Sequence, residues 1–479
     1  NWVQKINPVP IINTGHVDYK GKRFEFICIN KENDGEVYEV ARGVDLKPIH
    51  QGQAFYRQGS QNAILPATGR EKIRAAYLEK RIFELIDSYN GDGIPPIIVA
   101  LMIESWDIKY KGDKDFIELL VANSFDKFQK DIRILHRGEH SFINIKGSQG
   151  EIKNRNNILE FVAVKFYDDY WDKFESALKV VINSIGNNLS KPKAQRGIFV
   201  LGEEGLYSKG FLKGVYDFVA YVSTHEKLFS SCNTYRIENL TYECLSTIFN
   251  SSDWKVWGTL EPYIDSIIEW KPDLFLRLFQ ESLQSDDNVF KELFNEKEEG
   301  IIAVNYGHKL CNGLQKLAYY NEYFTSSLNI LFQLSKFRKD IIESIIMILL
   351  PGNPLTKASL DSRYNIVRSF FKDDLELGWS IGVQLLPNKV FGGQSIQGLK
   401  YRDEISPVIV PRKEYMDISI QYFSLLLEYA DNDDIKLSAL LSDFWHMFLE
   451  MQIKLIDSIK AKNTNYKHIS FEVYLSLVK

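Results

Sequence analysis

The chain has 479 residues, and at about 150 residues per domain this length predicts two to four domains. Hydrophobic residues make up 45% of it and charged residues 25%, a balance that excludes a disordered chain, a collagen-like chain and a disulfide scaffold. The net charge of -5 excludes a basic coat over the whole surface, but it allows a local basic patch that binds nucleic acid.

Residues 1–62 have the pattern of a small α+β unit. Residues 23–29 alternate and are rich in β-formers, and residues 37–40 and 54–58 predict two further strands. Residues 70–88 then place apolar side chains at the spacing of an amphipathic helix. The run 90–96, Asn-Gly-Asp-Gly-Ile-Pro-Pro, is the plainest break in the chain and follows this helix.

Residues 91–157 form a mixed connecting region. The apolar run 99–106 fits a strand or a buried helix, because periodicity does not distinguish the two for a short apolar run. Residues 147–157 are rich in Gly, Ser, Asn and Lys, which predicts a loop.

From residue 158 to residue 479 the pattern is almost entirely helical. Ser359 and Asp361 are candidate N-caps, and the run 351–354, Pro-Gly-Asn-Pro, is a strong stop that could divide the array into two sub-domains near residues 351–360. Similar helix lengths and short connectors predict stacked helical hairpins. Helices are expected over residues 158–185, 209–228, 241–250, 260–283, 312–349, 360–371, 413–429 and 434–460.

The fold class is therefore mostly α, with a partial small α+β module at the N-terminus followed by an irregular α-helical repeat array that is solenoid-like. Large flat side chains at helical positions usually fill helix–helix interfaces, so we expect the tryptophans of this array to be core residues rather than stacking platforms. These tryptophans are Trp171, Trp254, Trp257, Trp270, Trp379 and Trp445.

Motifs for catalysis are missing or incomplete. No string has the residues of a P-loop, and His225-Glu226 lacks the second histidine of a zincin. The segment around Ser208 has one residue too many for a nucleophile elbow. The sequence identifies no self-sufficient active site and no cofactor.

Two further patterns favour a structural explanation. His136 and His140 flank Glu139, but Gly138 interrupts the helix and Arg137 adds positive charge, so a surface loop is favoured over a metal site. The acidic runs 168–169, 286–287 and 431–434 fit helix ends better than a catalytic pair.

The cysteine and apolar patterns indicate a cytoplasmic protein without a membrane partner. Cys28, Cys232, Cys244 and Cys311 form no CxxC pair and have no histidine at ligand spacing, so we expect reduced and mostly buried thiols. The longest apolar stretches, residues 94–103 and 341–350, have about half the length of a membrane span, and no signal segment opens the chain.

The string from residue 54 to residue 62, Ala-Phe-Tyr-Arg-Gln-Gly-Ser-Gln-Asn, is followed by Pro-Ala-Thr at 66–68 and a helix. It resembles the end of the AlbA-like nucleic-acid-binding domain, which also forms the core of Schlafen proteins. That family has a strand with the pattern Tyr-x-Arg-x-Gly-Ser-x-Thr. Tyr56, Arg57, Gly59 and Ser60 match it if Phe55-Tyr56-Arg57 stands for the family's Tyr-Ile-Arg, whereas Asn62 replaces the threonine. Residues 17–29 resemble the preceding strand, so residues 1–90 correspond to the C-terminal part of the module.

The resemblance implies that Tyr56, Arg57, Gly59 and Ser60 bind nucleic acid, either tRNA or DNA. The planar guanidinium of Arg57 suits a phosphate, Gly59 allows close backbone approach and Ser60 adds a hydroxyl. Alternatively, Arg57 pairs with a carboxylate and Gly59-Ser60 only closes a strand.

Schlafen ribonucleases carry their catalytic acids in the upstream half of the module. The chain begins with Asn1 rather than Met, and the resemblance implies that it starts inside its first domain. The acids and divalent metal of a nuclease would then lie before Asn1, and no catalytic residue is assigned here.

The helical region contains a series of short motifs in a fixed order. They are Tyr207-Ser208 with Leu212 and Gly214, Trp254 with Trp257 and Leu260, Pro272-Asp273 with Phe275-Leu276, Arg363, Gly378-Trp379, Leu385-Leu386-Pro387, Arg402 and Glu414-Tyr415. This order loosely resembles that of a helical C-terminal region of large bacterial anti-phage proteins, although Lys213 stands near the place of a family arginine. Packed helix ends explain nearly all of these residues equally well.

Together the resemblances imply a bacterial anti-phage defence protein, in which the N-terminal module binds or cuts nucleic acid and the helical array senses an infection product or holds an assembly. One alternative is a non-enzymatic helical scaffold for a protein partner. Another is an AlbA-type transcription regulator, although residues 70–90 offer one helix and no recognition pair. The trigger, a nuclease activity and a homo-oligomer are left open.

Overall fold

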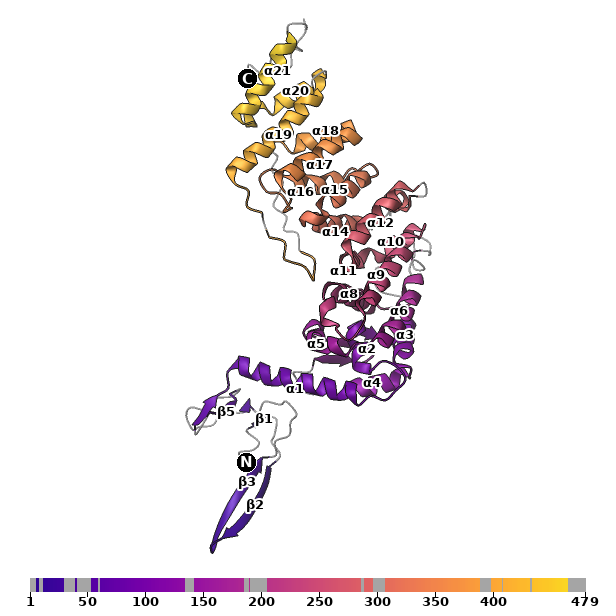
Figure 1. The fold of residues 1–479 in the computed structure, drawn as a ribbon, viewed down its shortest axis with the longest axis vertical. Helices are drawn as coiled ribbons and strands as arrows, with labels where there is room; N and C mark the ends of the chain where they lie inside the picture. Colours follow the sequence, from indigo (N-terminus) through magenta and orange to yellow (C-terminus); the bar gives the residue numbers. More distant parts are fainter. Residues whose placement is uncertain are drawn as a thin grey trace. The chain divides into compact units, whose positions relative to one another are not determined.

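The computed structural model describes residues 6–7, 12–29, 39–40, 53–58, 61–133, 142–184, 189, 205–285, 288–295, 306–387, 398–406, 408–430 and 433–463. This part of the chain is mostly α-helical, as the sequence predicts (Figure 1). The chain forms two compact units, the first of residues 1–101, 117–144 and 152–166 and the second of residues 102–116, 145–151 and 167–479. The division of the chain near residues 90 and 157 stays a prediction.

The N-terminal strands form short antiparallel pairs. β2 (Ile12–Tyr19) pairs with β3 (Lys22–Ile29), β5 (Phe55–Gln58) pairs with β6 (Gln61–Ile64), and β1 (Ile6–Asn7) pairs with β4 (Glu39–Val40). The strands predicted over residues 23–29 and 54–58 are confirmed as β3 and β5, and β4 confirms the described part, residues 39–40, of the strand predicted over 37–40. Their partners β2 and β6 were not predicted, because small and polar residues fill most of their positions.

The first long helix has a clear helical periodicity in the sequence, whereas the apolar run that follows it has none. α1 (Ala67–Asp87) confirms the helix predicted over residues 70–88. The run 99–106 divides between α2 (Pro96–Ile103) and β7 (Ser105–Asp107), and Glu104 joins them with a left-handed φ of 60°. Every residue of α2 is buried, so this helix has no polar face and no helical periodicity to detect.

The loop predicted over residues 147–157 is wrong. β8 (Ile143–Lys146) turns at Gly147 into β9 (Gln149–Ile152), and α5 (Arg155–Val162) begins directly after it. These strands complete a sheet in the order β7-β9-β8. The Trp106 ring lies on Gly150 where any side chain would overlap it, so the glycine in this run serves close packing within a strand.

Helices of moderate length make up the rest of the described chain. The helices predicted over residues 209–228, 241–250, 360–371 and 413–429 are confirmed with shifted ends, whereas those predicted over 158–185, 260–283, 312–349 and 434–460 each divide into two or more helices. In chain order after α5 they are α6 (Asp168–Asn183), α8 (Lys209–Thr224), α9 (Thr234–Phe249), α10 (Trp254–Leu260), α11 (Ile264–Trp270), α12 (Pro272–Gln284), α13 (Val289–Asn295), α14 (His308–Ala318), α15 (Asn321–Ser335), α16 (Ile341–Leu349), α17 (Leu360–Asp373), α18 (Leu375–Gln384), α19 (Arg412–Ala430), α20 (Asp434–Ser442) and α21 (Leu449–Asn463).

Helix starts follow local chemistry. Pro272 is the first residue of α12, where its missing N–H costs nothing. The proline also breaks the longer helix that the apolar pattern predicts. Ser359 caps α17 by accepting a hydrogen bond from the Ser362 amide, as predicted, whereas Asp361 lies in the first turn of that helix. Asp433 caps α20, so the acidic run 431–434 has the expected role at a helix end.

Aromatic rings fill the interfaces between these helices. Successive helices of the second unit pack on one another, including α14 on α15 and α17 on α18 (Figure 1). Trp171, Trp257 and Trp270 are buried, which confirms their predicted core role. Trp445 is 66% exposed, so its predicted place in the core is wrong.

The described cysteines are free thiols, and two of them are buried. Cys232, Cys244 and Cys311 are free thiols, and burial raises the pKa of both Cys244 and Cys311 to about 12. Those two thiols therefore stay protonated near neutral pH. Among the described residues, no helix combines the length and apolar character needed to cross a membrane.

Gly214 provides a test of how tightly α8 packs. A methyl group on Gly214 would overlap the Ile103 carbonyl oxygen. We expect Gly214→Ala to destabilise the protein by about 1–3 kcal/mol, because overpacking outweighs the gain of about 1 kcal/mol in helix propensity. Thermal unfolding measures the effect, with Val180→Ala on the exposed face of α6 as the control that changes stability by less than about 0.5 kcal/mol. An unfolding temperature unchanged by Gly214→Ala would contradict this packing.

Candidate functional sites

Two of the four residues predicted to bind nucleic acid, Tyr56 and Arg57, are among the described residues. Tyr56 and Arg57 lie in β5, where the register places Arg57 opposite Asn62 in β6. Gly59 and Ser60 lie outside the described residues. The structure thus gives Tyr56 and Arg57 a strand position, and the nucleic-acid contact stays a prediction.

The sequence also raises a histidine pair and a serine. His136 and His140 lie outside the described residues, and within the described part no three His, Cys, Asp or Glu side chains gather to hold a metal ion. Ser208 caps α8, because its hydroxyl accepts from the Phe211 amide and donates to Asp113 Oδ2 at 2.6 Å. The hydroxyl is committed to a helix start, so its role here is structural.

A non-helical segment elsewhere in the chain is held by hydrogen bonds with side chains of the helical array. Residues 398–406 precede α19, are not helical, and run beside α14 and α11 to reach α8 (Figure 1). The Glu269 carboxylate on α11 accepts the main-chain N–H of Lys400 at 2.6 Å and that of Tyr401 at 3.0 Å. One buried side chain therefore holds two consecutive peptide units. We call residues 398–406 the strap.

A second buried acid holds the Lys400 side chain. The Lys400 ammonium lies 2.6 Å from Asp217 Oδ2 on α8, and Lys213 reaches the same oxygen at 2.6 Å. The Ser266 hydroxyl donates to the other oxygen of Asp217. Two ammonium groups and a hydroxyl thus compensate a carboxylate that is 2% exposed.

Tyrosines bind the rest of the strap through its main chain. Tyr320 Oη donates to the Asp403 carbonyl at 2.9 Å, and Tyr319 Oη donates to the Ser406 carbonyl and accepts from the Ser406 amide. The Arg402 guanidinium lies 5.4 Å from the centre of the Tyr323 ring, a cation–π distance. The strap is therefore recognised along its length, largely through main-chain groups that any peptide offers. Its residues 400 and 401 lie in a turn, which lets their two consecutive N–H groups reach the same carboxylate.

The two acids differ in charge state. Burial raises the pKa of Glu269 to about 7, although the two amides and Arg402 oppose the shift. Burial also acts to raise the pKa of Asp217, but the hydrogen bonds from Lys213, Lys400 and Ser266 outweigh it and hold that pKa below its usual range. Asp217 is therefore charged at neutral pH, while Glu269 titrates near it.

The same use of a carboxylate recurs twice. Asp113 accepts the main-chain N–H of Asp107 and of Ser208, each at 2.9 Å, and burial raises its pKa to about 6. Glu261 accepts the Lys309 amide at 3.0 Å in the first turn of α14, and burial raises its pKa as well. Asp113 therefore fixes a non-helical segment through amides, whereas Glu261 satisfies an amide at a helix start.

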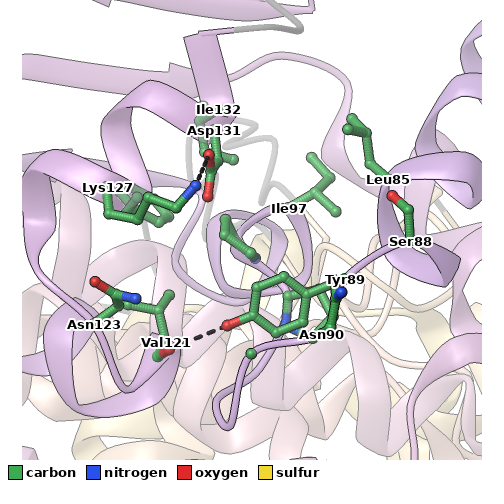
Figure 2. A pocket seen from close by; sticks show the side chains of 14 residues that line it. Leu85, Ser88, Tyr89, Asn90, Ile97, Val121, Asn123, Lys127, Asp131 and Ile132 are labelled. Carbon is green, nitrogen blue, oxygen red and sulfur yellow. Dashed lines mark hydrogen bonds and ion pairs between the residues drawn. The ribbon is translucent and has the colours of Figure 1, made fainter.

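A cavity in the first unit is the other candidate site (Figure 2). It has a volume of about 380 Å³ between the end of α1, the turn before α2, the end of α3 (Lys111–Val121) and α4 (Phe125–Arg133). Tyr89 Oη donates to the Val121 carbonyl at 3.2 Å and closes one side. Lys127 and Asp131 form an ion pair of 2.8 Å, and burial followed by the charge of Asp131 raises the pKa of Tyr89.

Neither the strap site nor the cavity was predicted from the sequence. Asp217 and Glu269 look like ordinary charges on helices, and only their burial distinguishes them. The break at residues 90–96 was visible, and it is this break that builds one wall of the cavity. No known protein family, curated protein or solved structure matches this chain.

The Glu269 carboxyl predicts how stability changes with pH. Its pKa is higher in the folded chain, about 7, than the ordinary 4.5, so the folded chain binds more protons between these values. The stabilisation from this group is therefore full below pH 4.5 and declines as the pH rises through 7. Glu269→Gln removes this dependence. As the pH rises from 5 to 8, we therefore expect the unfolding temperature of the wild type to fall relative to that of the variant.

Differential scanning fluorimetry of both proteins across that range measures the difference. Asp113 titrates in both proteins, so its effect cancels in the comparison. Glu292→Gln, an exposed substitution on α13, is the matched control and should follow the wild type. A constant gap between wild type and Glu269→Gln would contradict the raised pKa.

Proposed function

We propose that the helical array binds a non-helical segment of a partner protein, and that the strap occupies this binding site in the free protein. The observation that carries the proposal is the pair of hydrogen bonds from Lys400 N and Tyr401 N to Glu269. Proteins that capture peptide segments obtain affinity from main-chain hydrogen bonds and specificity from side-chain contacts. Concave faces of helical arrays are common sites for such binding.

The charges and rings around the strap indicate what the partner segment contains. Asp217 binds an ammonium group, and Tyr221 and His225 meet the Tyr401 ring edge-on at 5.6 Å and 6.1 Å. Tyr323 faces a guanidinium. The proposed partner is therefore a non-helical segment with a lysine, an aromatic residue and an arginine in succession.

We further propose that this binding serves bacterial defence against phage, with the array sensing a protein made or altered during infection. The order of the two family resemblances supports this role. The N-terminal module would contact nucleic acid through Tyr56, Arg57, Gly59 and Ser60, and a nuclease step with its divalent metal would need acids from the upstream half of the module. Such a protein would act in the cytoplasm.

One feature of the described N-terminal strands supports a nucleic-acid contact. Val17, Tyr19, Phe24 and Phe26 are exposed, and the register of β2 with β3 puts them on one face of the ribbon. Lys20 lies beside this face, 5.3 Å from the centre of the Tyr19 ring. Exposed aromatic rings next to cations suit unpaired bases and their phosphates.

Displacing the strap tests the first proposal. A labelled peptide with the sequence of residues 398–406 should bind Lys400→Ala/Tyr401→Ala at least about tenfold more tightly than the wild type, because a tethered segment competes at millimolar effective concentration. Lys255→Ala/Tyr242→Ala changes the same residue types on α10 and α9 and should behave as the wild type. Fluorescence anisotropy gives both affinities.

Adding Glu269→Gln to the strap variant should abolish peptide binding, because one of the two amide acceptors is replaced by a donor. Equal binding to the wild type and to the strap variant, or binding that survives Glu269→Gln, would exclude the proposed groove.

Arg57 tests the nucleic-acid contact. We expect Arg57→Ala to weaken binding of tRNA and of duplex DNA by a similar factor and to reduce the slope of log affinity against log salt by about 1, as for one lost phosphate contact. Arg412→Ala on α19 is the matched control. Anisotropy titrations between about 50 and 200 mM salt measure the slope, and an unchanged affinity would favour the alternative in which Arg57 only closes a strand.

A further inference from the structure

Close main-chain contacts hold the walls of the cavity in the first unit in place. Gly93 lies so close to the Val121 main chain that any side chain would overlap it, and Ile94 N donates to the Leu120 carbonyl at 2.8 Å. These contacts fix the turn before α2 to the end of α3. Ala122 continues that end with a φ of 50°, a conformation that costs energy for a residue with a side chain.

The floor of the cavity is apolar. Ile97 is 3% exposed, Phe128 is fully buried and Ile132 is 1% exposed, and Pro95 and Pro96 complete this surface. The volume of about 380 Å³ lies within the range of about 300–1,000 Å³ found for small-molecule sites. An apolar floor of this size suits a ring system.

The rim is polar and carries no net charge. Lys127 and Asp131 neutralise each other at 2.8 Å, and Ser88, Asn90 and Asn123 add a hydroxyl and two amides (Figure 2). Asn123 Oδ1 accepts from the Ser124 amide, which leaves its amide nitrogen to donate into the site. The rim therefore offers both donors and acceptors to a neutral molecule.

Phosphate does not fit this arrangement. α2, the helix that begins at the cavity, starts with Pro96 directly after Pro95, and neither proline has the main-chain N–H that binds anions at a helix N-terminus. The ammonium of Lys127 is already paired. A neutral group is favoured over an anion.

Tyr89 supplies a surface for stacking. The Gly91 main chain packs against its phenol group, and the hydrogen bond to Val121 holds the ring in place at the cavity. Aromatic rings bind flat partners through offset stacking, and asparagine amides pair with the edges of purine bases.

We propose that this cavity binds a neutral purine ring, with Tyr89 stacking on the base and Asn90 and Asn123 contacting its polar edge. A free nucleoside and an unpaired base of a nucleic acid present the same ring. The site lies in the first unit and is independent of the strap.

Isothermal titration calorimetry with the full chain tests this assignment, with adenosine, uridine and inorganic phosphate as the probes. We expect adenosine to bind, uridine to bind more weakly because its ring stacks over a smaller area, and phosphate not to bind. Single-stranded oligoadenylate separates the two sources of the ring: affinity above that of adenosine indicates an unpaired base, and affinity below it indicates the free nucleoside.

Variants of Tyr89 give the sharpest comparison. Tyr89→Phe keeps the ring and should bind adenosine within about twofold of the wild type, whereas Tyr89→Leu should lose at least about tenfold. Tyr235→Leu, an exposed tyrosine on α9, controls for the substitution, and circular dichroism checks the fold. Because Tyr89→Leu also removes a structural hydrogen bond, Asn123→Ala provides a second variant with the same expected loss.

The assignment would be overturned by phosphate binding as tightly as adenosine, by no heat with any nucleoside, or by wild-type affinity in both Tyr89→Leu and Asn123→Ala.

Discussion

Buried carboxylates that accept main-chain amides hold the non-helical segments of this protein in place. A carboxylate in a low-dielectric interior is costly unless hydrogen bonds replace its lost hydration. Asp113 and Glu269 each meet this requirement with amides from another part of the chain, and Glu269 reaches across 131 residues. The amides gain as well, since a non-helical segment inside an array has no helix to satisfy its N–H groups. Helix packing alone would leave these segments without partners.

The strap depends on two acids of opposite behaviour. Asp217 binds an ammonium group and keeps its charge, because two lysines compensate its burial. Glu269 binds neutral amides, which compensate burial less completely, so its pKa rises. The Lys400 side chain is thus held by a charge pair and the Lys400 main chain by a group that titrates near neutral pH. The strap is therefore attached by one contact whose charge stays constant near neutral pH and by another whose charge changes there.

The helical array could be predicted because amphipathic periodicity and N-caps are local signals. Ser359 is the N-cap of α17 and Pro272 is the first residue of α12, and both are local signals. The long apolar runs, however, showed no sign of several breaks between helices that only tertiary packing produces. α2 had no detectable period because it is buried on all sides. The strap site could not be predicted, since Glu269 has the sequence context of any helix acid and its partners lie far along the chain. The cavity likewise joins a visible turn to two helices that no local pattern relates to it.

The strap also sets a limit on what can replace it. A tethered segment competes with a free one at an effective concentration in the millimolar range, so a partner with the same contacts would not displace it at ordinary cellular levels. Displacement needs additional contacts, and the tyrosines that bind Asp403 and Ser406 only through main-chain groups leave side-chain specificity there to the incoming segment. An array that already binds a segment by its main chain would therefore respond to a partner that adds side-chain contacts. In the proposed function, self-binding of this kind would turn a general peptide site into a selective one.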